Sequence, residues 1–303
     1  MKDNLFTENL KQSIGMRVLF FLIILLISSL IGIAIPKILI FFAGNTRMKI
    51  GQGISSIMMF VVPPVVYYFI ICKDHPMHNL GLRKLTPPWW LILIGVIVMF
   101  VSIPVTTSLT TWNESMCLGG ALSRLEEWMK DMEETAKAFT DKMVNVNTIG
   151  GLLLNLIIIA LIPAIGEELT FRGVLQQSLT RKINPHIAII LSAAIFSFFH
   201  FQFYGFLPRM FLGVLLGYMF YITDSLWTSM LMHFVNNGAS VALYYLDNKG
   251  LIKDAEHWGE TQNMWIIAAS AVITTGLIVW SWEKAQPKQP AKVAPTIPPI
   301  GND

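Results

Sequence analysis

The stretch GGLLLNLIIIALIPAIGEELTFRG, residues 150–173, decides the fold. Its first part, up to Ile165, has no charged side chain and is apolar enough to enter a lipid bilayer. Its second part places two adjacent glutamates and an arginine, Glu167, Glu168 and Arg172, in the same segment. Ionisable groups are costly inside a membrane and mark function there by default. The stretch therefore predicts a membrane-spanning helix that carries a polar site.

The composition of the whole chain also indicates a membrane protein. Of its 303 residues, 54% are hydrophobic and only 14% are charged. A soluble domain carries about 25% charged residues. The net charge of +3 is too small to indicate binding to nucleic acid. We therefore expect the lipid bilayer, and not a nucleic acid, as the main surrounding of the chain.

Apolar runs along the chain predict an all-α, polytopic bundle of about eight transmembrane helices. The runs show no alternation of apolar and polar residues, which excludes a transmembrane β-barrel. The predicted helices cover residues 17–43, 51–72, 88–111, 148–179, 185–203, 206–223, 225–247 and 263–282. Lys and Arg in the loops favour both chain ends in the cytoplasm. Short loops without eukaryotic targeting signals favour a multi-pass protein of a bacterial cytoplasmic membrane.

The predicted helices divide the chain into three parts. Residues 1–147 hold three helices and an extracytoplasmic amphipathic segment, in which apolar residues recur at spacings of three and four. This segment has two possible roles: it caps or gates the membrane part, or it is a connector packed on the bundle. Residues 148–283 hold five helices that form the expected catalytic core. Residues 284–303 are rich in proline and predict a disordered tail.

Three of the predicted core helices carry polar groups at a similar depth in the membrane. Their distances from the inner helix ends, at about 1.5 Å per residue, are roughly 16 Å for Glu168, 22 Å for His200, 12 Å for His233 and 18 Å for Asn237. A spacing of four residues also puts His233 and Asn237 on one helix face. The same spacing pairs Glu168 with Arg172 and Phe196 with His200. We expect these faces to line one hydrated cavity.

The residue types in this cavity favour hydrolysis by an activated water. A glutamate away from bulk water gains proton affinity and becomes a better general base. A histidine beside it can help to orient the water, and a second histidine and an asparagine can donate hydrogen bonds to an oxyanion. Glu167, His200 and His233 are also a possible zinc ligand set. The usual His-Glu-x-x-His signature of a zinc protease is not in the sequence.

The motifs Glu167-Glu168-x-x-x-Arg172, Phe196-x-x-x-His200 and His233-x-x-x-Asn237 resemble those of the CAAX-processing and bacteriocin-processing (CPBP or Abi) intramembrane proteases. The resemblance is strong over residues 148–247. It implies that Glu167 activates water with His200 as its partner, and that His233 and Asn237 bind the oxyanion. It further implies that Glu168 and Arg172 support the site and that Phe196 is a wall of the pocket. It implies a peptide or membrane-protein substrate. It favours a metal-free mechanism, with a zinc-dependent metalloprotease as the alternative.

Other interpretations of the same residues stay open at this point. In one alternative to the protease, the chain is an immunity or scaffold protein without catalysis. In a second, it is a proton pathway. In a further interpretation, Glu168 and Arg172 form a purely structural ion pair. Asn237 could likewise serve only to link two helices. Replacing Glu167 separates the enzyme from the alternatives that do not need its carboxylate.

Overall fold

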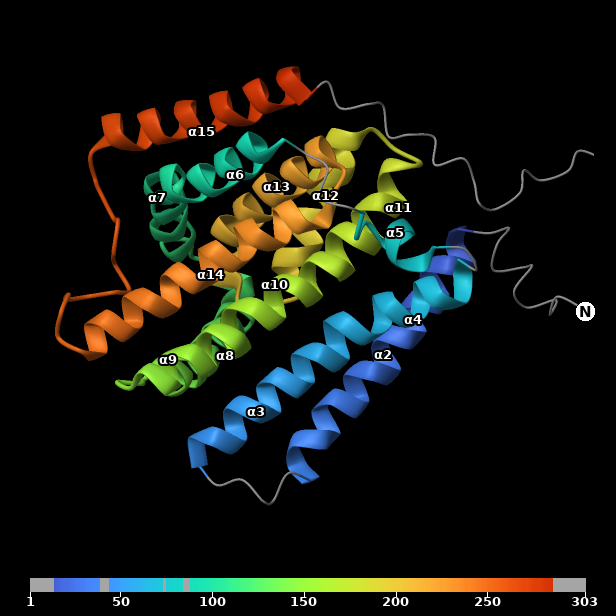
Figure 1. The fold of residues 1–303 in the computed structure, drawn as a ribbon. Helices are drawn as coiled ribbons and strands as arrows, with labels where there is room; N and C mark the ends of the chain where they lie inside the picture. The colour runs from blue at the N-terminus through green and yellow to red at the C-terminus, as the bar shows by residue number, and fades with distance from the viewer. Residues whose placement is uncertain (1–13, 39–43, 73–74, 84–87, 286–303) are drawn as a thin grey trace, which may run out of the picture.

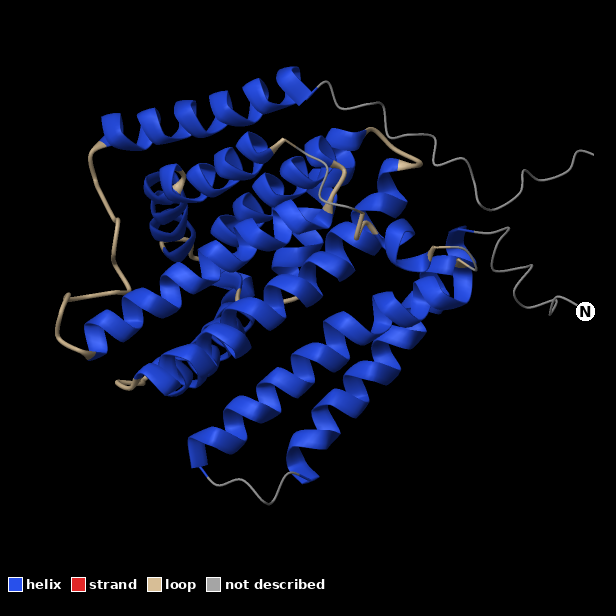
Figure 2. Ribbon diagram, in the orientation of Figure 1, coloured by secondary structure: helices blue, strands red, loops and turns tan. Residues whose placement is uncertain are grey.

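The computed structural model describes residues 14–38, 44–72, 75–83 and 88–285, and every regular element within them is a helix (Figures 1 and 2). The elements are α2 (Ile14–Ile38), α3 (Gly44–Ser56), η1 (Ile57–Val61), α4 (Val62–Ile71), α5 (Pro76–Leu80), α6 (Trp89–Val101), α7 (Ile103–Glu114), η2 (Gly120–Leu122), α8 (Ser123–Val144), α9 (Ile149–Asn155), η3 (Leu156–Leu161), α10 (Ile162–Glu167), η4 (Glu168–Gln176), α11 (Gln177–Thr180), α12 (Pro185–Phe198), η5 (Phe203–Gly205), α13 (Phe206–Thr223), α14 (Leu226–Asn248) and α15 (Met264–Ala285). The all-α fold is confirmed. The predicted tail from residue 286 onward lies outside the described residues.

The number of membrane spans differs from the predicted eight. In the described part of the chain, five helices are long and apolar enough to cross a membrane, or six if the bent pair α6 and α7 is one span. The helix α12 has only 14 residues, which is short of the roughly 20 that a span needs. The helix α14 has 23 residues, but its polar side chains keep it out of this set. The chain is a multi-pass membrane protein, and eight spans are not shown.

Two prolines shape the long spans and create contacts between them. Proline has no N–H, so the carbonyl four residues before it loses its helical partner. Pro64 frees the carbonyl of Phe60, and the Thr170 hydroxyl donates to that oxygen at 2.9 Å. Pro163 frees the carbonyl of Ile159 in the same way. The turns before both prolines, η1 and η3, are wider π-helical turns, as is η4. Proline is expected to disturb a helix, and at Pro163 the disturbance is a change of helical pitch within one continuous span.

The helix α14 lies in the middle of the bundle and contacts both halves of the core (Figure 1). On one side Leu226 and Met230 join a cluster with Tyr68 and Leu169. On the other side Met232 packs with residues of α6, α13 and α15. The helices α2 to α4 form a layer along one edge, and α15 covers α6, α7 and α13. A polar helix is stable at this position because its neighbours shield it from lipid.

The outermost helices expose their apolar side chains, as a lipid-facing surface requires. Leu26 on α2 is 60% exposed and Val272 on α15 is 71% exposed. Soluble proteins rarely expose apolar patches of this extent. Trp89 and Trp265 stand exposed at the first turns of α6 and α15, where interfacial anchors are typical.

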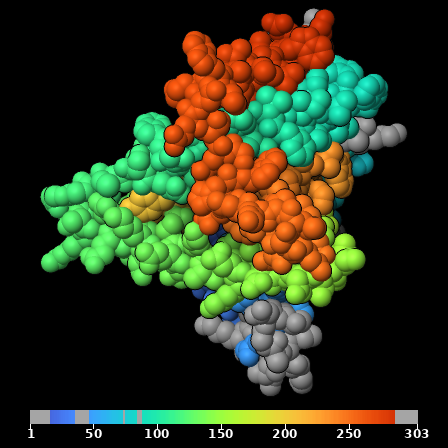
Figure 3. Space-filling model, turned by 90° about the vertical axis from the view of Figure 1, so that its left-hand side faces the viewer, coloured from blue at the N-terminus to red at the C-terminus, as the bar shows by residue number. Residues whose placement is uncertain are grey.

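The amphipathic segment is the helix α8, which stands out from one side of the molecule (green in Figure 3). Glu126 accepts the backbone N–H groups of Gly119 and Leu118 and pairs with Lys130, so its pKa falls to about 2. Glu133 accepts the backbone N–H of Tyr204 at 3.2 Å, in the loop that follows His200. The segment thus contacts the bundle through this polar bond, and the choice between its two predicted roles stays a prediction. It also leaves Leu125 exposed.

Candidate active site

Glu168 and Arg172 form a fully buried ion pair on one face of η4. Their Oε1 and Nη1 atoms are 2.7 Å apart, and the two side chains are 0% and 1% exposed. Arg172 also donates from Nη2 to the carbonyl of Gly213 at 2.9 Å, and its guanidinium lies 4.8 Å from the centre of the Phe196 ring. A buried charge needs such complete partners because desolvation is otherwise unfavourable. The predicted pairing of Glu168 with Arg172 is present.

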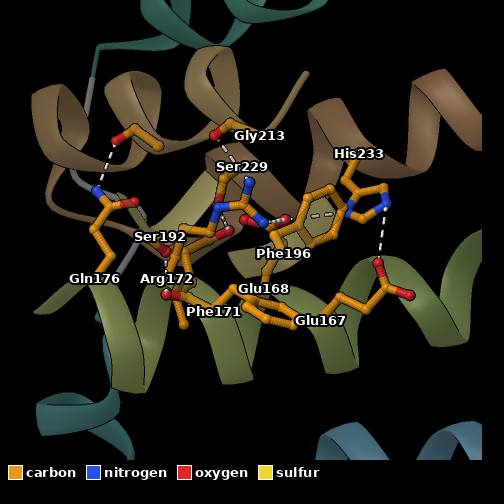
Figure 4. Close-up of polar contacts among 12 residues, drawn as sticks. Glu167, Glu168, Phe171, Arg172, Gln176, Ser192, Phe196, Gly213, Ser229 and His233 are labelled. Carbon is orange, nitrogen blue, oxygen red and sulfur yellow. Dashed lines mark hydrogen bonds and ion pairs between the residues drawn. The ribbon is translucent and has the colours of Figure 1, made fainter. Parts of the chain in front are cut away.

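His233 turns toward both glutamates from α14 (Figure 4). Its Nδ1 lies 2.9 Å from Oε1 of Glu168, and its Nε2 lies 3.7 Å from Oε2 of Glu167. A carboxylate only accepts hydrogen bonds, so Nδ1 carries the proton and donates it to Glu168. This bond fixes the tautomer of the ring and directs Nε2 at Glu167.

Glu167 has fewer polar contacts than Glu168 and is less buried. It is 9% exposed, whereas Glu168 is completely buried. Its one ion-pair partner among the described residues is His233, at a distance too long for a direct hydrogen bond. A water molecule about 2.8 Å from each group, an ordinary hydrogen-bond length, would bridge this distance. Glu167 can therefore hold a water molecule against His233.

Phe196 connects the two histidines of the site. Its ring packs edge-to-face on His200 at 5.0 Å and on His233 at 6.0 Å. The carbonyl of Phe196 accepts a hydrogen bond from Nδ1 of His200 at 3.0 Å. The Nε2 of a neutral His200 is then a free acceptor. No ion pair joins His200 directly to Glu167 in the described part of the chain.

Asn237 lies one turn beyond His233 on α14 and contacts the carbonyl that Pro163 frees. Its Nδ2 is 3.5 Å from the oxygen of Ile159, which is a long hydrogen bond. Its Oδ1 accepts a bond from Nδ2 of Asn236 at 3.2 Å. The expected helix link by Asn237 is therefore present in weak form, and one N–H of its amide remains available.

Three polar neighbours of the site were not identified from the sequence. Gln176 is 1% exposed and donates to the carbonyl of Gly217, one turn below the Arg172 contact. Ser192 on α12 donates to the carbonyl of Phe171. Asn236 is the neighbour of Asn237 in the sequence and donates from its Nδ2 to Oδ1 of that side chain at 3.2 Å. The Arg172 and Gln176 spacing of four residues is the one sequence signal that pointed to any of them.

The structure brings two of the three possible zinc ligands, Glu167 and His233, close together. The described residues contain no group of three His, Cys, Asp or Glu side chains that could hold a metal ion. Within the set Glu167, His200 and His233, the first and last form an ion pair, and the Nδ1 atoms of both histidines bond to oxygen, which leaves each Nε2 as the nitrogen that could bind a metal. The absence of a cofactor, with zinc as the alternative, stays a prediction.

The comparison with protein families gives one match, to residues 149–239. The matching family is described as Rce1-like, type II CAAX prenyl endopeptidase. The matched range begins with α9, ends within α14 and includes every residue of the candidate site. No curated protein and no solved structure matches the chain.

Proposed function

We propose that this chain, whose residues 149–239 form a domain of the Rce1-like type II CAAX prenyl endopeptidase family, is an intramembrane endopeptidase. The family implies a protease with a peptide substrate. The observation that supports the proposal most directly is the contrast between the two glutamates. Glu168 is held by Arg172 and His233 through its Oε1, while Glu167 beside it forms only the long contact with His233 among the described residues.

In the proposed reaction, Glu167 takes a proton from a water molecule while the oxygen of that water attacks the peptide carbonyl. The acceptor Nε2 of His200 helps to orient the water. The carbon becomes tetrahedral and its oxygen becomes negative. Glu167 then returns the proton to the departing amine nitrogen, the C–N bond breaks, and a carboxylate and a free amine result.

The role of His233 follows from its bond to Glu168. With Nδ1–H donating to Glu168, a neutral ring has no proton on Nε2. His233 can therefore donate to an oxyanion only as the imidazolium, which Glu168 stabilises. Arg172 in turn keeps Glu168 ionised and in place. Asn237 supplies its available N–H as the second donor of the proposed oxyanion site.

The experiment compares the wild-type protein with Glu167→Gln in proteoliposomes that contain mixed membrane proteins. New peptide termini are identified by mass spectrometry. Glutamine has the same shape but cannot accept the proton, so we expect at least a 100-fold loss of cleavage, within the usual range for a general base of about 10²–10⁴. The matched control is Glu127→Gln, an exposed glutamate on α8, which should cleave as the wild type does.

Equal product formation by Glu167→Gln and the wild type would contradict the proposed role of Glu167. Cleavage that is lost after chelation and restored by zinc would favour the metalloprotease alternative. If no cleavage occurs and Glu167→Gln leaves the cellular phenotype unchanged, the immunity or scaffold alternative stands.

A further inference from the structure

A second arginine, Arg209, lies beside the candidate site without an anionic partner. It occupies the first turn of α13, and its guanidinium donates to the backbone oxygen and to Oε1 of Gln202. Both acceptors are neutral. Its Nε is buried and has no hydrogen-bond partner. No ion pair reaches Arg209 in the described ranges, in contrast to Arg172, which has Glu168.

This arrangement is unfavourable for an arginine with a purely structural role. A half-buried cation whose Nε is enclosed loses hydration, and an anion normally compensates for the loss. Neither nearby carboxylate forms an ion pair with Arg209 in the described ranges. Glu256 pairs with Lys137, and Glu133 is engaged with Tyr204 and Gln202. The unpaired guanidinium therefore points to an anion that comes from outside the chain.

The space for such an anion is a cavity of about 330 Å³ that Arg209 lines. Small-molecule pockets in proteins begin at roughly 300 Å³. The walls are mostly apolar and come from α6, α7, α13, α14 and the loop around Glu256. They include Met99, Leu212, Leu215, Val235 and Leu243. This composition suits a short apolar segment that ends in, or carries, one anionic group.

The cavity borders on the proposed reaction centre. Asn236 lines it and bonds to Asn237, the proposed oxyanion donor. A peptide seated in the cavity can therefore extend from Arg209 toward Glu167.

We propose that Arg209 binds a carboxylate of the peptide substrate in this cavity and so positions the scissile bond at Glu167. The inference rests on the proposed protease function. Arginine is suited to the task because its planar guanidinium forms charge-assisted bonds with both oxygens of a carboxylate. The carboxylate has two possible sources, the C-terminus of the peptide or an acidic side chain. Arg209 is a positioning and specificity residue for the proposed reaction.

The test measures binding, so that it does not depend on cleavage. Glu167→Gln protein in detergent is titrated with fluorescein-labelled Ala-Val-Leu peptides, chosen for the apolar walls, and binding is followed by fluorescence anisotropy. One peptide has a free C-terminus, one is amidated, and one is amidated but ends in Asp. Hydrogen bonds to charged groups are worth about 1.5–3 kcal/mol, so a peptide that presents the recognised carboxylate should bind about 10- to 100-fold more tightly than the neutral amide. Preference for the first or the third peptide identifies the source of the carboxylate.

The variants then assign the preference to Arg209. Arg209→Gln, made in the same background, should bind all three peptides equally and weakly, and Arg209→Lys should restore part of the preference. The exposed Arg124→Gln on α8 is the matched control and should behave as the parent protein does. With an intact Glu167, Arg209→Gln should raise KM more than it lowers kcat. Equal affinity for acid and amide in the parent protein, including no binding of any peptide, would overturn the inference, and so would an unchanged preference in a folded Arg209→Gln protein.

Discussion

Two glutamates that are neighbours in the sequence have different surroundings in the structure. Glu168 bonds to Arg172 and His233 through its Oε1, and it is completely buried. Glu167 faces His233 at 3.7 Å and retains some exposure. The first carboxylate is therefore suited to holding other groups in place. The second is suited to exchanging a proton with water.

Glu168→Gln tests this division of roles through stability. The change leaves the Arg172 guanidinium buried without an anion, and breaking a buried pair costs about 3–5 kcal/mol. We expect a loss of this size in the free energy of unfolding, measured by titration with a denaturing detergent. Glu167→Gln should change the same quantity much less, because no fully buried charge loses its partner.

Two further variants serve as controls for this prediction. The double variant Glu168→Gln and Arg172→Met should recover part of the loss, since it removes the uncompensated charge. Lys137→Gln breaks the exposed pair with Glu256 and should cost only about 0–1 kcal/mol. If Glu168→Gln proved no more harmful than Lys137→Gln, the buried pair would not organise the site as described.

The sequence predicted part of this local arrangement. The spacing of four residues indicated the Glu168–Arg172 pair, which is present. It did not indicate that His233 would donate a hydrogen bond to the carboxylate of Glu168, because that contact joins residues 65 positions apart. The sequence also could not predict the hydrogen bond from Nδ1 of His200 to the carbonyl of Phe196, because spacing fixes a helix face but not a side-chain rotamer. The catalytic roles of these residues stay predictions.

At the scale of the elements, irregular helices connect the spans. Pro64 and Pro163 each free a carbonyl, and Thr170 and Asn237 on neighbouring helices donate to those two oxygens. The sequence showed where the prolines are, and the expected disturbance lies at that place. It did not reveal the partner side chains, because a freed carbonyl has no signature of its own in the sequence.

The close packing of α12 on α13 depends on Gly213. A Cβ at Gly213 would lie 2.9 Å from the Cβ of Ala193, which is too close for two carbon atoms. The carbonyl of Gly213 also accepts the Arg172 bond. Gly213→Ala should therefore push the helices apart, weaken the contact with Arg172 and lower the free energy of unfolding by about 1–3 kcal/mol.

The control for this prediction is the same substitution at Gly276 on α15. A Cβ there meets nothing within 4 Å. Alanine stabilises an open helical position by roughly 0.5–1 kcal/mol relative to glycine. The two variants should thus shift the unfolding midpoint in opposite directions. A neutral or stabilising Gly213→Ala would show that α12 and α13 are not as closely packed as the structure indicates.

At the scale of the whole molecule, all eight apolar segments predicted from the sequence correspond to helices, but length and composition support five or six spans. The difference arises at α12 and α14. Apolar runs locate a helix, but the sequence does not say whether its neighbours shield a short or polar helix from lipid. The helix α14 is polar because it carries the candidate site, so the same residues that suggest function weaken the signal for a membrane span.

The two natural cysteines can test the orientation of the bundle. Both thiols are free; Cys117 is exposed before α8, and Cys72 is half-buried at the end of α4. The predicted topology places Cys117 outside and Cys72 in the cytoplasm. On intact bacterial cells expressing the protein, a membrane-impermeant maleimide should label Cys117 and not Cys72. Cys117→Ser should abolish this labelling, and permeabilised cells should then show labelling of Cys72.

The result bears on the route of the substrate. The cavity at Arg209 is lined by Thr107 in the first half of α7 and by Tyr244 near the end of α14, and the predicted topology places that end of α14 outside, with Cys117. Labelling of Cys117 alone therefore implies that a peptide reaches the cavity from outside the cytoplasm. Labelling of Cys72 alone would show that the topology is the reverse of the predicted one. The peptide would then reach the cavity from the cytoplasm. Equal labelling of both cysteines on intact cells would contradict a bundle that crosses the membrane between them.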